Sequence, residues 1–250
     1  MKLLNLGKTE LFLIFFVLVH IIIGIVLYFT NLDLFVIYVE EDRYIENLTA
    51  LILFAAAFHF LWKAIKSNNK LLKASCALLF LLFLFGGGEE ISYGQRIFGF
   101  DTPDNYAKMN RQGEVTVHNL KINGVDINRV IFSTVLYVSA FIYFIGLPIL
   151  YRKSKWLRTW KYFMVPVPKL IHGILFTLFF LLILVTESDI KGCWEIEEFN
   201  LVSFLYLSFL FQQNKTFMAN PGDSSEADTA GRPPDPPTSR SSKKSHGIEA

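Results

Sequence analysis

Six long apolar segments divide this chain, at residues 11–30, 46–65, 72–92, 129–151, 169–186 and 195–213. A helix rises about 1.5 Å per residue, so about 20 mainly apolar residues cross a hydrocarbon core about 30 Å thick. Hydrophobic residues make up 52% of the 250-residue chain and charged residues only 18%, which argues against a soluble domain. We therefore expect an all-α fold, a polytopic membrane bundle of about six transmembrane helices.

Basic residues mark alternate connections of this bundle. They precede the first segment, separate the second from the third and the fourth from the fifth, and follow the sixth: Lys2, Lys8, Lys63, Lys66, Lys70, Lys73, Arg152, Lys153, Lys155, Arg158, Lys161, Lys169 and Lys215. Positively charged connections stay in the cytoplasm, so we expect both termini to be cytoplasmic. The basic residues are thus explained as topology signals, and the net charge of +2 indicates no nucleic-acid partner.

Two parts of the chain lack a membrane-spanning pattern and differ in composition. Residues 93–128 contain the aromatic residues Phe98, Phe100 and Tyr106, so we expect a folded cap on the outer face. From about Ala219 onward the chain has no aromatic residue and is rich in Pro, Ser, Asp and Lys. Such a composition buries too little apolar surface to fold. We expect a membrane domain at 1–215 and a disordered cytoplasmic tail at 216–250.

Acidic residues gather at one end of three apolar segments. The second segment begins with Glu46, the third ends with Glu89 and Glu90, and the sixth begins with Glu195 and Glu198. These carboxylates lie at membrane depth, because the apolar part of the sixth segment alone is too short to cross the bilayer. Carboxylates at that depth are costly, so the cluster predicts a functional site, a polar pocket that faces outward.

Polar residues of the expected cap add candidate ligands. Glu114 and His118 are four positions apart, so on a helix they would share a face and supply two metal ligands, or a base and the group that orients it. We predict catalytic roles for Glu46, Glu89, Glu90 and His118. We predict binding roles for Gln95, Arg96, Asn110, Glu114, Asn119, Glu195 and Glu198. A divalent metal ion is expected, if one binds, at Glu90, Glu114 and His118.

Two features also have a purely structural interpretation. Arg96, Arg111 and Arg129 lie on the same side as the acids and can neutralise three carboxylates through forked hydrogen bonds. The three glycines at residues 86–88 fit either the wall of an outward-facing pocket or close packing of two helices. Both interpretations stay open at the level of the sequence.

Two sequence blocks carry a resemblance to known proteins. They are GEEISYGQR at residues 88–96 and NRQGEVTVHN at residues 110–119. In these blocks the chain resembles a group of uncharacterised bacterial multi-pass membrane proteins, which implies the bacterial cytoplasmic (inner) membrane and no particular chemistry. Glu89 and Glu90 also resemble the acidic pair of the CAAX-processing and bacteriocin-processing intramembrane proteases. Gly94 stands where that motif has arginine, so this similarity is a distant analogy.

These observations lead to three hypotheses. The first is a membrane-embedded hydrolase, in which a divalent cation or a protonated Glu90 activates water against a lipid or peptide substrate. The second is a proton- or cation-coupled transporter or sensor, for which the sequence offers little polar path inward apart from His59 and His172. The third is a non-catalytic subunit whose cap binds another membrane protein. A three-histidine zinc site, as in alkaline ceramidase-like hydrolases, is excluded because His118 is the single histidine expected at the outer face.

Overall fold

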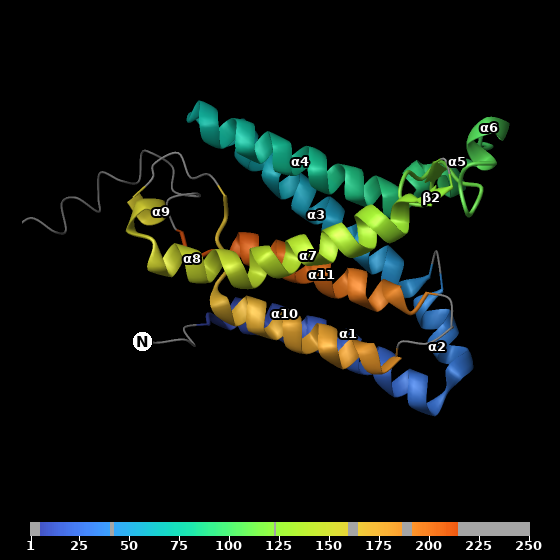
Figure 1. The fold of residues 1–250 in the computed structure, drawn as a ribbon, viewed down its shortest axis with the longest axis horizontal. Coiled ribbons are helices and arrows are strands. Elements are labelled where there is room, and N and C mark those ends of the chain that lie inside the picture. Colours follow the sequence, from blue (N-terminus) through green and yellow to red (C-terminus); the bar gives the residue numbers. More distant parts are fainter. Residues whose placement is uncertain (1–5, 41–42, 123, 160–164, 187–191, 215–250) are drawn as a thin grey trace, which may run out of the picture.

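The computed structural model describes residues 6–40, 43–122, 124–159, 165–186 and 192–214. Figure 1 shows a bundle of long helices with a group of short elements at one end. The tail expected at 216–250 lies outside the described residues, so its disorder stays a prediction.

The described part of the chain is mostly helical. Long helices are α1 (Lys8–Thr30), α3 (Tyr44–Lys66), α4 (Lys70–Glu90), α10 (Leu170–Ile183) and α11 (Trp194–Leu210). Another long helix is continuous and consists of η2 (Asn128–Val135), α7 (Leu136–Phe141), η3 (Ile142–Gly146) and α8 (Leu147–Lys153), with η2 and η3 in π-helical geometry. The short helices beside them are α2 (Leu32–Val39), α9 (Lys155–Thr159) and η4 (Leu184–Thr186).

Four stretches are long and apolar enough to cross a membrane: Lys8–Thr30, Lys70–Glu90, Ser133–Lys153, and Leu32–Lys66, which includes both α2 and α3. This confirms the prediction of a helical chain with membrane-length helices. Leu170–Thr186 is apolar but shorter, and α11 has 17 residues with acidic residues in its first turn. A helix of that length extends about 25 Å, somewhat less than the hydrocarbon core. Six membrane crossings therefore stay a prediction.

α11 is the central helix of the bundle, because it packs against α1, α3 and α10. One hydrophobic cluster joins its Phe199 and Phe204 to α1 and α10. A second cluster joins Phe209 to Phe60 of α3 and Phe83 of α4. The rings of Phe60 and Phe83 are stacked with centroids 5.8 Å apart, and Phe209 meets them edge-on at 5.5 and 5.6 Å. Aromatic packing of this kind fixes the position of α11 against both sides of the bundle.

The long helices run side by side, so their termini gather at the two ends of the bundle (Figure 1). α4 ends and α3 and α11 begin at one end, which we call the acidic end because Glu46, Glu90 and Glu195 lie there. α1, α4 and α10 begin and α8 ends at the opposite end, which we call the basic end after Lys70 and Lys153. The side of the membrane that each end faces stays a prediction.

Residues 91–127 connect α4 to η2 at the acidic end, and we call them the interhelical segment. It contains the short helices η1 (Ser92–Gly94), α5 (Gln95–Phe98) and α6 (Asp104–Ala107). Its two strands, β1 (Lys121–Ile122) and β2 (Val125–Asp126), pair antiparallel, with Lys121 opposite Asp126. The segment thus has a compact fold of its own, and its position over the outer membrane surface stays a prediction.

The three glycines at 86–88 permit close packing at the end of α4. A Cβ atom on Gly87 would lie 3.0 Å from the ring of Phe54 in α3. A Cβ atom on Gly88 would lie 2.8 Å from the ring of Tyr93. Neither ring leaves room for a larger side chain. Of the two interpretations of the glycine triplet, the geometry supports close packing.

Candidate functional site

A strained turn follows α4 at the acidic end. Ser92 and Tyr93 have φ values of 48° and 51°, in the left-handed region that residues other than glycine rarely adopt. Such conformations cost about 1–3 kcal/mol each and persist only where surrounding contacts impose them. Here the Tyr93 ring packs on Gly88, and the Ser92 hydroxyl donates a hydrogen bond to the Glu114 carboxylate. The turn folds the interhelical segment back over the end of α4.

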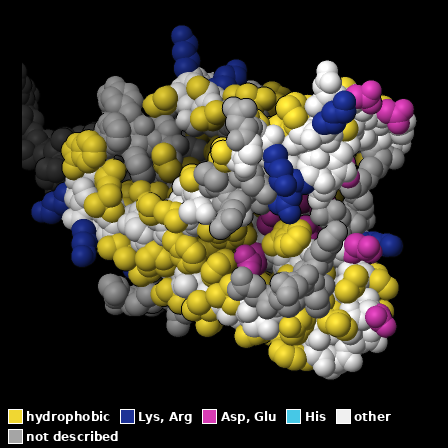
Figure 2. Space-filling view, turned by 45° about the vertical axis from the view of Figure 1, so that its right-hand side comes forward, with side chains coloured by type: hydrophobic (Ala, Val, Ile, Leu, Met, Phe, Trp, Pro, Cys, Tyr) yellow, Lys and Arg dark blue, Asp and Glu magenta, His cyan; other side chains and the backbone are white. Residues whose placement is uncertain are grey.

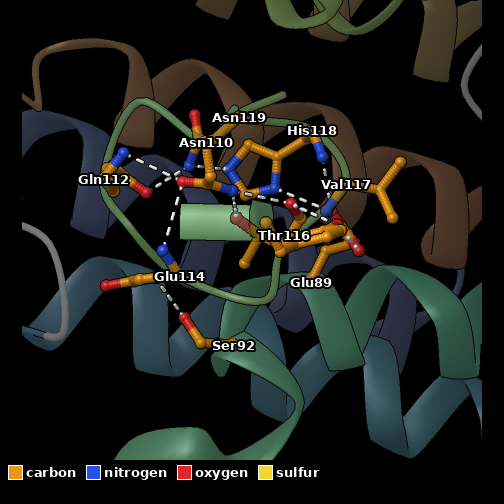
Figure 3. Close-up of polar contacts among 10 residues, drawn as sticks. Glu89, Ser92, Asn110, Gln112, Glu114, Thr116, Val117, His118 and Asn119 are labelled. Atoms are coloured by element: carbon orange, nitrogen blue, oxygen red, sulfur yellow. Dashed lines mark hydrogen bonds and ion pairs between the residues drawn. The ribbon is translucent and has the colours of Figure 1, made fainter. Parts of the chain in front are cut away.

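Glu89 anchors one loop of the interhelical segment, as Figure 3 shows. The backbone N–H of Val117 donates to the carboxylate at 2.8 Å to Oε2 and 3.1 Å to Oε1. His118 reaches Oε2 twice, with its backbone N–H at 2.7 Å and with ring atom Nδ1 at 2.9 Å. Glu89 is only 5% exposed, and a buried carboxylate needs such donors in place of water. The carboxylate therefore fixes the ring of His118 above α4.

The second ring nitrogen of His118 faces the Asn119 side chain. Asn119 Nδ2 lies 2.8 Å from Nε2 and also donates to the side-chain oxygen of Gln112. With Nδ1 protonated toward Glu89, Nε2 accepts the hydrogen bond from Asn119. The ring is then the neutral tautomer whose basic nitrogen is Nε2. A carboxylate that orients a histidine in this way also makes the other ring nitrogen more basic.

The electrostatic surroundings of His118 connect this loop with the carboxylates of the helices. Burial lowers the pKa of His118, but the hydrogen bond to Glu89 and the charges of Glu198, Glu89 and Glu46 outweigh it and raise the pKa above its ordinary value. The side chain is 27% exposed, so water still reaches the ring. A histidine with these properties is suited to accept a proton near neutral pH.

Asn110 determines the shape of the loop that carries His118. Its Nδ2 donates to the backbone oxygen of Thr116 at 2.8 Å, and its Oδ1 accepts from the backbone N–H groups of Gln112 at 2.9 Å and Glu114 at 3.3 Å. Such side-chain bonds to the backbone compete with helix formation. The loop is not helical, so Glu114 and His118 do not share a helix face and the expectation of that pairing is wrong.

Gln95 joins two parts of the interhelical segment. Its Nε2 donates to Thr102 Oγ1 at 2.7 Å, and its Oε1 accepts from the backbone N–H of Val115 at 3.1 Å. Gln95 thus stabilises the fold around the site, and its binding role stays a prediction. The side chains of Arg96 and Arg129 lie outside the described residues, so neutralisation of the acids by arginine also stays a prediction.

Three carboxylates from two helices meet at the acidic end. Glu90 of α4 and Glu195 and Glu198 of α11 each have an oxygen within 4.8 Å of the other two. Glu195 and Glu198 are three positions apart, so they project from the same side of α11. Among the described residues, this group alone brings three potential metal ligands so close together. On the surface of this end, acidic side chains are recessed in a hollow between hydrophobic side chains, with a basic side chain beside them (Figure 2).

The chemistry of this carboxylate group suits a hard divalent cation. Oxygen ligands are preferred by Mg²⁺, Ca²⁺ and Mn²⁺, and three negative charges at such distances require neutralisation by a cation or by protons. The hydroxyl of Tyr137 on α7 is buried with no hydrogen-bond partner in the described part of the chain, and it lies in the field of the same carboxylates. It offers a further polar atom at the site.

The structure places eight of the eleven predicted site residues in two adjacent groups. Glu90, Glu195 and Glu198 form the carboxylate group, whereas Glu89, Asn110, Glu114, His118 and Asn119 belong to the hydrogen-bonded loop. Gln112 also belongs to this loop and was not predicted as a site residue. Of the expected metal ligands, Glu90 lies in the first group, and Glu114 and His118 lie in the second. Sequence reasoning missed Ser92, Thr116 and Tyr137. Ser92 carried a signal, because it lies inside the GEEISYGQR block, but Thr116 and Tyr137 are marked by no local pattern.

Comparison with known proteins adds no assignment. No family model matches the chain, and no curated protein or solved structure matches it. The resemblance to bacterial multi-pass membrane proteins therefore stays a prediction, and function is argued from the geometry of the site.

Proposed function

We propose that this protein is a membrane-embedded hydrolase that binds a divalent cation at its acidic end and cleaves a lipid or peptide substrate. The observation that carries the proposal is the meeting of Glu90, Glu195 and Glu198 within 4.8 Å beside the oriented ring of His118. Metal-assisted hydrolysis requires two parts: acidic ligands that bind the cation, and a base positioned to take a proton from water.

Cation binding follows from the charges at this end. Glu195 is 5% exposed, and Glu90 and Glu198 are partly buried, so bulk water screens their repulsion poorly. One divalent cation neutralises most of that charge and takes oxygen ligands from two helices at once. A cation bound there would also lower the pKa of a water molecule and so supply the nucleophile.

The protein side of the reaction is assigned to His118. Nε2 is the basic atom, and it takes a proton from water after the Asn119 side chain releases it, while Glu89 holds Nδ1 at 2.9 Å. Asn119 and Asn110 keep the ring and its loop in place. Like the histidine of other hydrolytic sites, this ring has a carboxylate on the side away from the reacting water.

The orientation of the site belongs to the same proposal. Basic residues at the opposite end support six crossings, both termini in the cytoplasm and an outward-facing site in the bacterial inner membrane. The interhelical segment then covers the site from the outside, and the surrounding bilayer brings lipids or membrane proteins to it.

Hydrolysis by the purified protein in lipid vesicles tests the proposal. Fluorogenic phospholipid and peptide substrates are offered with Mg²⁺ or Mn²⁺, and then with a chelator. We expect cation-dependent cleavage that falls about a hundredfold or more in Glu198→Gln and His118→Gln, because each removes one part of the machinery. Glu197→Gln, a neighbouring carboxylate outside the group, is the matched control and should retain activity within about twofold.

The outcomes separate the hypotheses. Cleavage that survives the chelator, or Glu198→Gln at the wild-type rate in folded protein, contradicts the assigned roles. A folded wild-type protein that cleaves none of the substrates favours a second candidate, a proton- or cation-coupled transporter. That candidate has specific support in the buried polar side chains of α11.

A further inference from the structure

Buried polar side chains follow one side of α11 from the acidic end toward the basic end. Asn200, Ser203 and Ser208 are 0%, 6% and 0% exposed. At about 100° per residue they fall within an arc of about 140° of the helix. Asn200 Nδ2 donates to the backbone oxygen of Phe176 at 3.3 Å, and Ser208 Oγ lies 3.3 Å from Nδ1 of His172. The polar side of α11 therefore faces α10, inside the bundle and away from lipid.

Two of these side chains have buried atoms that the described residues leave unsatisfied. Oδ1 of Asn200 and Oγ of Ser203 have no hydrogen-bond partner in the described part of the chain. Buried polar atoms are almost always paired, and where the protein supplies no partner an ordered water molecule usually does. The pair thus indicates bound water near the middle of the central helix.

At the basic end the polar line continues into a buried ionic network. His172 is 0% exposed and Glu10 of α1 is 1% exposed. The Glu10 carboxylate lies 2.6 Å from Nε2 of His172 and accepts from Lys169 Nζ at 2.8 and 2.7 Å. Glu10 and Lys169 are the charged groups that face His172 among the described residues, and α11 contributes the neutral Ser208. The Lys169 side chain is 26% exposed, so the network reaches the surface at the basic end.

The spacing along α11 determines how much water the path requires. Glu195 at the acidic end and Ser208 are thirteen positions apart, or about 20 Å along the axis, with Asn200 and Ser203 between them. The steps between successive polar residues are about 7.5, 4.5 and 7.5 Å of helix rise. The two longer steps also turn by about 140° around the helix, so each of them needs a chain of several water molecules with hydrogen bonds of about 2.8 Å.

We propose that water bound to Asn200 and Ser203 completes a proton-conducting path through the membrane, from the acidic end to Glu10 at the basic end. The activity is separate from hydrolysis and requires no titration of Glu90, Glu195 or Glu198. Chains of polar side chains inside membrane helices serve as proton relays in pumps and transporters. This protein has the same two features: buried polar atoms along α11, and a titratable pair, His172 and Glu10, at the basic end.

Each transfer in the relay conserves protons. Nε2 of His172 donates to Glu10, so the lone pair of Nδ1 faces the Ser208 hydroxyl. A proton that arrives through water at the Ser208 oxygen releases the hydroxyl proton to Nδ1, and the ring then passes its Nε2 proton to the Glu10 carboxylate. The Lys169 ammonium releases a proton to water at the basic end, and Glu10 passes its own proton to the Lys169 amine in its place. Reorientation of the side chains and water restores the starting state, and one proton has crossed.

Proton flux into vesicles that contain the full chain tests the path. A potassium gradient with valinomycin drives protons inward, and an enclosed pH-sensitive dye reports them against protein-free vesicles. We expect flux above the protein-free rate, and a fall of about tenfold in Ser203→Ala and in Asn200→Leu, because each removes a water ligand from the path. Thr49→Val is the matched control, since Thr49 is 0% exposed and its hydroxyl donates to Ile45 within its own helix at 3.0 Å.

Flux equal to that of protein-free vesicles overturns the path, as does wild-type flux in both Ser203→Ala and Asn200→Leu. An equal loss in Thr49→Val would also overturn it, because any buried hydroxyl would then have the same effect. Thermal unfolding of each variant identifies misfolded protein, and Ser203→Ala, the smaller change, remains decisive where Asn200→Leu does not fold. Hydrolysis can fail without any effect on these outcomes, so the two proposals are tested separately.

Discussion

Replacement of Glu89 by glutamine should lower the pKa of His118, and the size of the change follows from the hydrogen bonds. The carboxylate lies 2.9 Å from Nδ1 and carries the charge that favours the protonated ring. A hydrogen bond to a charged group contributes about 1.5–3 kcal/mol, and one pKa unit corresponds to about 1.36 kcal/mol. The glutamine side chain still has one oxygen that can accept a hydrogen bond, but it lacks the negative charge of the carboxylate. The pKa of His118 should therefore fall by about one to two units.

Histidine-selective NMR in lipid nanodiscs measures this change directly. The chain has five histidines, and the signal that His118→Gln removes is the one to follow. Glu114→Gln is the matched control, because Glu114 accepts from Ser92, whereas the histidine ring contacts Glu89 and Asn119. A pKa of His118 that is unchanged in Glu89→Gln, or that falls equally in Glu114→Gln, would refute the assigned geometry.

The remaining predictions concern stability. Gly88→Val should destabilise the fold by about 1–3 kcal/mol, because the added side chain overpacks against Tyr93. Denaturant titration in detergent measures the loss, and Gly7→Ala is the control because a Cβ atom on Gly7 would meet no neighbouring atom. Phe83→Ala should cost about 3–5 kcal/mol in the same titration, whereas Leu81→Ala, 58% exposed, should cost less than about 1 kcal/mol. Because the folded pKa of His118 is raised, its stabilising contribution is present below the ordinary value of about 6.5 and is lost as the pH rises through the raised value. Thermal unfolding measured across this pH range should show stability falling with pH in the wild type and not in His118→Gln. The same dependence of stability on pH in both proteins would contradict the prediction.

The long helices and their charged ends could be predicted from the sequence, because both depend on local patterns. Apolar runs of about 20 residues determine where helices form, and α3, α4 and α11 begin or end close to the predicted positions. α2 was not predicted, because the sequence after Thr30 has the pattern of a connection between helices. Its N-cap is Asn31, whose side chain accepts a hydrogen bond from the backbone N–H of Leu34. The number of membrane crossings depends on α10 and α11, which are short for a bilayer.

The loop around His118 could not be predicted, because its contacts are distant in sequence. Glu89 and His118 are 29 positions apart, and the Asn110 side chain replaces the helical hydrogen bonds that a Glu-x-x-x-His pattern would use. The polar side of α11 was overlooked for a different reason. Single Asn and Ser residues do not interrupt an apolar run, and only the helical spacing of Asn200, Ser203 and Ser208 reveals that they share a side.

The central claim is that the carboxylate group at the acidic end binds a cation, and plasma mass spectrometry of purified protein tests it most directly. Protein dialysed against Mn²⁺ and then desalted should retain about one ion per chain, because three carboxylates supply the ligands that Mn²⁺ prefers. Glu198→Gln should lose the ion and Glu197→Gln should keep it. Folded wild-type protein without bound metal, or equal retention in Glu198→Gln, would contradict the claim and leave protons as the neutralising charge.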